Sequence, residues 1–281
     1  MGSCSICKDE KELEKRGKKE LNIEIESIKE SEPKKENKPI KENMSEKEIE
    51  TNKEQINNFI IAEIDIKDNY INKDIRIINS YEEYHRKWDF KQLIANKMNE
   101  AVIMECEITI NDKLVSFNYF YNFKEKGKYI IKYKFNNDFP RLNYLFYKCD
   151  LLTKLDFSNF NTENITTMEA MFSECNSLTD INFSNFNTQN VTNMNHLFYR
   201  CKSLIKLDLS CFDTKNVINM FSMFEGCKSL INLNIENFNT EKVDIYEMDY
   251  MFEGCESLKI ENIITEDEKI KHIFSRENIL F

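Results

Sequence analysis

One sequence motif of about 26 residues recurs along the second half of this 281-residue chain. Its plainest copy is VTNMNHLFYRCKSLIKLDL, from Val191 to Leu209, and related copies fill residues 139–258. A cysteine marks the same place in each of the five copies: Cys149, Cys175, Cys201, Cys227 and Cys255. The step is 26 residues, except for the last step of 28, which indicates a two-residue insertion. Self-similarity at a fixed period predicts a stack of repeats, because neighbouring units can cover the apolar face that one unit cannot cover alone.

Each copy combines two spacings of apolar residues. From Val191 to Cys201 they fall three or four apart, which predicts a short helix. Leu204, Leu207 and Leu209 end in strict alternation, which predicts a short strand with one buried face. Equivalent positions should pack as columns through the stack: Phe157, Phe183, Leu209 and Ile235; Phe160, Phe186, Phe212 and Phe238; Met168, Met194, Met220 and Met248.

The phrase SLTDINFSNFNTQNVTNMNHLFYRC closely resembles the BspA-type leucine-rich repeats of protist and bacterial proteins. The resemblance covers residues 129–260, a little under half of the chain. It implies an α/β fold, a right-handed leucine-rich-repeat-like solenoid of short parallel strands and short helices. The chain departs from ordinary leucine-rich repeats where those place a turn-capping Asn, because it has Phe at that position: Phe160, Phe186, Phe212 and Phe238.

Composition divides the rest of the chain. Residues 1–56 are a mixed-charge run with too few apolar residues to offset the entropy of ordering, so we expect a disordered tether. Residues 57–128 should form a β-rich cap on the open end of the stack, residues 129–260 the repeats, and residues 261–281 a C-terminal cap.

Local patterns predict the elements of the two caps. FIIAEIDI and DIRIINS read as strands, SYEEYHRKWDFKQLI as a helix, and the segments around Asn111-Asp112-Lys113 as a hairpin. KYIIKYKF, after Gly127, is expected to be the first rung of the repeat stack. Near the C-terminus, Thr265 and the acids that follow it predict a helix start, with Ile270, Ile273 and Phe274 on the buried side: a C-terminal cap.

The nine cysteines resemble a disulfide framework until their positions are considered. Five occupy the same slot beside Phe in each repeat, where a thiol can act as a small apolar filler. The charged N-terminal segment has no apolar signal region, so reduced thiols in the cytoplasm are expected. Disulfides between successive repeats are the alternative. No apolar run approaches the length of a membrane span.

The first residues, MGSCSIC, suggest lipid attachment. Gly2 followed by Cys4 and Cys7 resembles a site of myristoylation and palmitoylation, although Ile6 stands where Ser or Thr is usual. An unmodified terminus with two idle cysteines is the alternative. A zinc site is disfavoured, because the next cysteine after this pair is Cys106.

No catalytic constellation can be assembled. The three histidines, His85, His196 and His272, lie in separate segments, and no phosphate-binding, dinucleotide-binding, zinc-protease or EF-hand motif is present. We therefore expect no enzymatic activity, cofactor or metal. The net charge of −10 argues against nucleic-acid binding.

Alternation within the predicted repeat strands places twelve polar side chains outward on one face. They are Lys154, Asp156, Ser158, Asp180, Asn182, Ser184, Lys206, Asp208, Ser210, Asn232, Asn234 and Glu236. Leucine-rich-repeat proteins commonly bind protein ligands on this face, so it is the predicted partner-binding site. The lack of aromatic residues favours the alternative, a merely solvated face.

These patterns predict a non-catalytic protein-binding scaffold with an unidentified protein partner, attached to the cytoplasmic face of a membrane if the N-terminus is acylated. Two alternatives remain open. One is an extracellular adhesin of the BspA type, and the other is a cryptic enzyme in residues 57–128.

Overall fold

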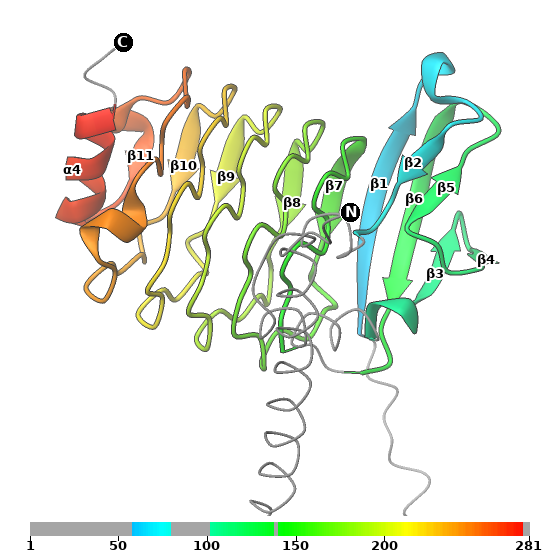
Figure 1. The fold of residues 1–281 in the computed structure, drawn as a ribbon, viewed down its shortest axis with the longest axis horizontal. Coiled ribbons are helices and arrows are strands. Elements are labelled where there is room, and N and C mark those ends of the chain that lie inside the picture. The colour runs from blue at the N-terminus through cyan, green and yellow to red at the C-terminus, as the bar shows by residue number, and fades with distance from the viewer. Residues whose placement is uncertain (1–57, 80–101, 138–139, 278–281) are drawn as a thin grey trace, which may run out of the picture. The chain divides into compact units, whose positions relative to one another are not determined.

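The computed structural model describes residues 58–79, 102–137 and 140–277 of this chain (Figure 1). All described residues belong to one compact unit, Gln55–Phe281. The predicted tether and the helix predicted at residues 80–94 lie outside the described residues.

One six-stranded sheet joins the N-terminal strands to the first repeats. Its order is β4-β3-β6-β1-β7-β8. The strands are β1 (Phe59–Ile66), β3 (Glu107–Ile110), β4 (Lys113–Val115), β6 (Gly127–Lys134), β7 (Leu152–Asp156) and β8 (Asp180–Asn182). Central strand β1 alternates between partly exposed and buried residues, as its sequence predicts. It runs antiparallel to both β6 and β7, so the N-terminal strands and the repeats share one sheet and one core.

The N-terminal strands confirm part of the prediction and correct another part. Asn111 and Asp112 both have positive φ and form the two-residue turn of the β3–β4 hairpin. KYIIKYKF is not the first rung of a parallel stack, because β1 lies between β6 and β7 and is antiparallel to both. The alternating pattern of β6 predicts which of its residues are buried, but it does not predict which strands pair with it. A separate antiparallel pair is formed by β2 (Asp74–Arg76) and β5 (Phe120–Asn122), and η1 (Asp68–Tyr70) is a short 3-10 helix.

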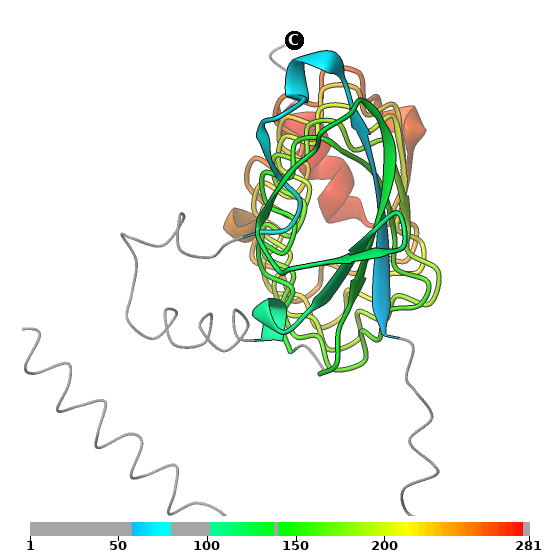
Figure 2. The ribbon, with the colours of Figure 1, turned by 90° about the vertical axis from the view of Figure 1, so that its right-hand side faces the viewer.

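The repeats stack through parallel strand pairs. β7 pairs with β8, and a second sheet of order β11-β10-β9 contains β9 (Lys206–Asp208), β10 (Asn232–Asn234) and β11 (Ile263–Ile264). Between β8 and β9 the strand pairing is interrupted, although a second line of parallel bridges, Arg141–Thr167–Asn193–Asn219, crosses this point. Figure 2 looks along the stack, so that the repeats overlap behind one another, with β1 along one side.

The expected α/β solenoid with short helices is wrong. Residues 140–265 contain no α-helix, only turns, short strands and the 3-10 helices η3 (Ile245–Met248) and η4 (Ile260–Asn262). The structure is instead a mostly β body with mixed sheets.

Backbone geometry explains why the predicted helices do not form. His196 and Arg200 both have positive φ, a conformation that an α-helix excludes. Every second N–H in this segment donates to a carbonyl of the next repeat; for example, the Phe198 N–H donates to the Met223 oxygen at 2.9 Å. Positive φ recurs at both positions in all five repeats. The residues equivalent to His196 are Tyr144, Ala170, Ser222 and Tyr250, and those equivalent to Arg200 are Lys148, Glu174, Gly226 and Gly254. Successive turns therefore produce the three- and four-residue apolar spacing.

The predicted apolar columns are confirmed. The column of Phe157, Phe183, Leu209 and Ile235 is buried, and the rings of Phe157 and Phe183 stack at a centroid distance of 5.8 Å. A further column runs through Phe198, which is fully buried and stacks between the rings of Phe172 and Phe224, at centroid distances of 5.3 and 5.8 Å. The Met column is fully buried. The column of Phe160, Phe186, Phe212 and Phe238, which lies in the turns after the strands, is at most 6% exposed. One apolar core runs from the N-terminal sheet to the last helix.

That last helix, α4 (Glu268–Glu277), covers the final repeat. The predicted buried residues Ile270, Ile273 and Phe274 are buried, and the Phe274 ring lies 5.3 Å from that of Phe252. The helix begins slightly later than predicted, because the Asp267 carboxylate, rather than Thr265, accepts the N–H groups of Lys269 and Ile270.

Candidate functional site

The twelve polar side chains predicted as a binding site lie on strands β7 to β10 and on the turns that follow; we call them the strand face. Eight are exposed: Lys154, Asp180, Asn182, Ser184, Lys206, Asp208, Asn232 and Glu236. The other four are partly buried: Asp156, Ser158, Ser210 and Asn234. The repeat stack thus brings the whole predicted set to one surface.

One column of the strand face has a structural role. In each repeat, the residue that ends the strand accepts the backbone N–H two residues later, and so closes an Asx turn. The Asp208 oxygen lies 3.0 Å from the Ser210 nitrogen, and the Asn182 oxygen lies 2.9 Å from the Ser184 nitrogen. Asp156 and Asn234 make the equivalent bonds. These side chains therefore define the turn after each strand.

A shallow depression interrupts the strand face where β8 and β9 do not pair. It is lined by Asn182, Phe183, Ser184, Asp208, Ser210 and Cys211. Cys211 is the exposed thiol among the described cysteines, and its sulfur lies 3.6 Å from the Phe183 carbonyl oxygen. Partial burial raises the pKa of Cys211 above its ordinary value, which disfavours the reactive thiolate.

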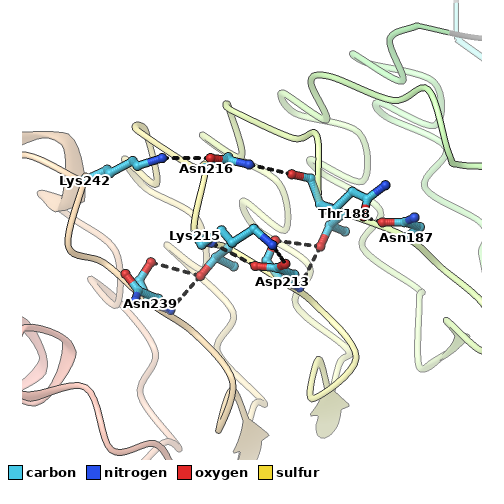
Figure 3. A network of polar contacts seen from close by, with 9 residues as sticks. Asn187, Thr188, Asp213, Lys215, Asn216, Asn239 and Lys242 are labelled. Carbon is cyan, nitrogen blue, oxygen red and sulfur yellow. Dashed lines mark hydrogen bonds and ion pairs between the residues drawn. The ribbon is translucent and has the colours of Figure 1, made fainter.

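A column of buried threonines, which the sequence analysis missed, connects successive repeats. Figure 3 shows one of them, Thr188, beside Asp213 of the next repeat. The Thr214 hydroxyl donates to the Asn239 carbonyl oxygen at 3.1 Å and accepts the Asn239 N–H at 2.7 Å. Thr188 bonds to Asp213 in the same way. The sequence signal was available, because each threonine follows the Phe of its repeat by two residues: Thr162, Thr188, Thr214 and Thr240.

The repeated cysteines are hydrogen-bond donors as well as apolar filler. The Cys201 thiol donates to the Phe172 carbonyl oxygen at 3.0 Å, and the Cys227 thiol donates to that of Phe198 at 3.1 Å. Cys175 and Cys255 make the equivalent bonds. Burial raises the pKa of these thiols, that of Cys255 to about 12. All described cysteines are free, and a disulfide would remove the hydrogen that each of these four bonds requires.

A second surface, which we call the turn face, carries the aromatic groups that the strand face lacks. It consists of His196, Tyr199, Arg200, Phe221 and Tyr250. The ring centroid of His196 lies 5.3 Å from that of Tyr199 and 5.6 Å from that of Phe221. The ring centroids of Phe221 and Tyr250 are 5.4 Å apart. The Arg200 guanidinium lies over the Tyr199 ring, 4.7 Å from its centroid. Three consecutive repeats thereby form one aromatic stripe.

The turn face departs from the repeat pattern. Phe221 occupies a position that is polar in the other four repeats: Asn143, Glu169, Asn195 and Asp249. Tyr250 is 49% exposed, and its position holds a ring in two other repeats, Tyr144 and His196, but Ala170 and Ser222 in the remaining two. Because other repeats fold without rings at these positions, the fold does not require them. Comparison of equivalent positions between copies would have revealed this signal in the sequence.

His196 lies in this stripe, in a segment of turns rather than in the short helix predicted from Val191 to Cys201. It is partly buried, and burial lowers the pKa of its imidazole below the ordinary value. Among the described residues, no group of three or more His, Cys, Asp or Glu side chains is arranged to hold a metal ion. The described part of the chain also contains no helix of the length and apolarity that a membrane crossing requires. His85 and the predicted lipidation residues Gly2, Cys4 and Cys7 lie outside it.

Comparison with known proteins gives one match. The model of a family described as "Mycoplasma protein of unknown function, DUF285" matches residues 140–265, a little under half of the chain. The matched segment coincides with the repeats and contains both the strand face and the turn face. No curated protein and no solved structure matches the chain.

Proposed function

We propose that this protein is a non-catalytic protein-binding scaffold, and that its partner binds the turn face. The observation that carries the proposal is the aromatic stripe through His196, Phe221 and Tyr250, at positions where the fold tolerates polar residues. Tyrosine, arginine and other large flat side chains contribute most of the binding free energy at protein interfaces.

The strand face supports the same function less well. Its side chains are short and polar, and its Asx column, which includes Asp208, is already bonded to the backbone. A partner would have to replace water on these groups without gaining much apolar contact area. We therefore place the main contact on the turn face.

The repeats support two further parts of the proposal. We propose that they are related to BspA-type repeats, which the shared phrase and the family match over residues 140–265 support. We also propose that the protein acts in a reducing compartment. Support comes from the buried thiols, which donate hydrogen bonds to the preceding repeat, as Cys201 does to Phe172.

Affinity capture from native lysate tests the binding surface. The turn-face variant combines Phe221→Asn with Tyr250→Ser, because Asn and Ser occur at the equivalent positions of other repeats. The matched strand-face variant combines Asp180→Arg with Asn232→Arg, two exposed positions on β8 and β10.

We expect the turn-face variant to lose the captured partner and the strand-face variant to retain it. Circular dichroism and thermal melting of both variants confirm that each remains folded. Capture of the same proteins by the wild type and the turn-face variant would exclude the turn face as the binding surface. Loss with the strand-face variant alone would assign the partner to the strand face instead.

A further inference from the structure

We propose that the turn face selects a peptide segment in which a carboxylate lies beside an apolar or aromatic side chain, with Arg200 as the residue that binds the carboxylate. This inference rests on the proposed function and specifies the chemistry of the partner. It depends on how Arg200 is held, on what surrounds it, and on the length of the aromatic stripe.

Arg200 is exposed, yet its side chain is held in place. Its guanidinium lies over the Tyr199 ring at 4.7 Å. Its aliphatic stem passes over Gly226, where a Cβ atom would lie only 2.9 Å from the Arg200 Cγ. Gly226 also has a positive φ of 72°, so a larger residue there would be strained. A guanidinium oriented in advance loses less side-chain entropy when it binds a carboxylate.

Two acids on the neighbouring repeats, Glu174 and Glu225, are engaged by other side chains. Glu174 accepts a hydrogen bond from the Tyr147 hydroxyl at 3.3 Å and lies 4.0 Å from the Lys148 ammonium group. Glu225 accepts a bond from the Ser222 hydroxyl at 2.6 Å. Within the described residues, the structure records no ion pair for Arg200. Because Arg200 is exposed, its guanidinium is accessible to a carboxylate of a partner, and charge complementarity favours an acidic segment.

The apolar part of the ligand follows from the stripe. From Tyr199 to Tyr250 the rings succeed one another at centroid distances of 5.3, 5.6 and 5.4 Å. At about 3.3 Å per residue, an extended peptide would cover the stripe with roughly five residues. A carboxylate over Arg200 and an apolar side chain against Phe221 or Tyr250 would then fit within one short segment.

A phage-displayed library of random peptides is the probe, with the immobilised full-length protein as bait. The pool retained by the wild type should be enriched in Asp or Glu, two to five residues from an aromatic or aliphatic side chain. Synthetic peptides from this pool are then made in matched pairs with Glu or Gln at the selected acidic position. Their affinities are measured for the wild type and for Arg200→Gln, with Arg200→Lys as a variant that retains the charge.

For the wild type, replacement of Glu by Gln in the peptide should weaken binding about three- to tenfold, as expected for an ion pair with oriented hydrogen bonds. For Arg200→Gln, the two peptides should bind equally, because the cycle isolates the pairwise interaction. Arg200→Lys should retain only part of the difference, since Lys lacks the planar fork. Full retention of the difference by Arg200→Gln would overturn the assignment of Arg200.

The remaining outcomes distinguish this inference from the proposed function. Retained peptides that need Phe221 but show no acidic enrichment would overturn the acidic ligand and leave the scaffold standing. A wild type that retains no peptide would also overturn the inference, while lysate capture would still test the scaffold. A wild-type dimer in sedimentation that Arg200→Gln dissociates would identify a second copy as the occupant and overturn the peptide proposal.

Discussion

The strand face and the turn face are built by the same repeats, yet their side chains do different things. On the strand face, residues such as Asp208 and Asn182 accept backbone hydrogen bonds, and equivalent residues do so in each repeat. On the turn face, the hydrogen bonds between repeats that fix the backbone use no side chain, as from the His196 N–H to the Phe221 carbonyl oxygen. Side chains there are free to vary. The side chains of the strand face therefore serve the fold, and the turn face, where side chains differ between repeats, is the better candidate for binding.

The largest expected effect is on the core that both faces share. Phe198 is fully buried between two stacked rings, so Phe198→Ala should lower the free energy of unfolding by about 3–5 kcal/mol. Denaturant unfolding measures this value, and both faces should lose their order together. If Phe198→Ala lost binding at one face and left the free energy of unfolding unchanged, the two faces would not depend on one core.

Buried positions were predictable from the sequence, whereas the backbone between them was not. Apolar spacing identified the columns through Phe212 and Met194, because burial depends on which residues share a face. The same spacing of three or four residues is produced by an α-helix and by successive turns. Positive φ at His196 and Arg200 decided between them, and neither side chain signals that conformation as Gly would.

The candidate site was also only partly predictable. Exposure of the strand face followed from alternation in the short strands, but the bonds that occupy Asp208 and Thr214 depend on where the chain turns. The turn face needed a comparison of equivalent positions, in which Phe221 stands among polar residues. Its contacts with His196 and Tyr250 join three repeats, so no single copy of the phrase contains them.

Substitution in the threonine column should give the next largest loss of stability. Thr214 is fully buried and its hydroxyl makes two hydrogen bonds to Asn239. Thr214→Val removes both, so we expect a loss of about 1–3 kcal/mol in unfolding free energy. Thr214→Ser is the matched control, because it keeps the hydroxyl. Equal losses for Val and Ser would show that packing of the methyl group, rather than the hydrogen bond, matters at this position.

Within the strand face, the Asx column should be distinguishable from its neighbours. Asp208→Ala removes the acceptor for the Ser210 N–H and should cost about 0.5–2 kcal/mol, as loss of a capping side chain does. Lys206→Ala, at an exposed position of the same strand, should change stability by about 0.5 kcal/mol or less. Asp208→Asn should behave as the wild type, because Asn182 and Asn234 fill the same role. Chemical denaturation of the three variants checks this order.

The turn face should contribute less to stability than the Asx column. Phe221 is partly exposed and Tyr250 is 49% exposed, so Phe221→Asn with Tyr250→Ser should lower the unfolding free energy by about 1 kcal/mol or less. The same measurement on Asp208→Ala is the reference. If the turn-face variant proves the less stable of the two, its rings serve the fold, and the contrast between the faces is reversed.

The smallest effect is expected from Cys211, whose exposed thiol lies in the depression of the strand face. Reaction with a maleimide places a bulky group there, and the buried thiols should stay unmodified, since burial removes access and raises the pKa of each. Cys4→Ser with Cys7→Ser removes two further thiols that would confuse the measurement. Mass spectrometry locates the adduct, and Cys211→Ser treated in the same way is the control.

If the turn face binds the partner, the labelled protein should capture it as the unlabelled protein does. Loss of capture on labelling, with no loss in the treated control, would place the partner against the strand face and restore the surface that alternation in the sequence first indicated.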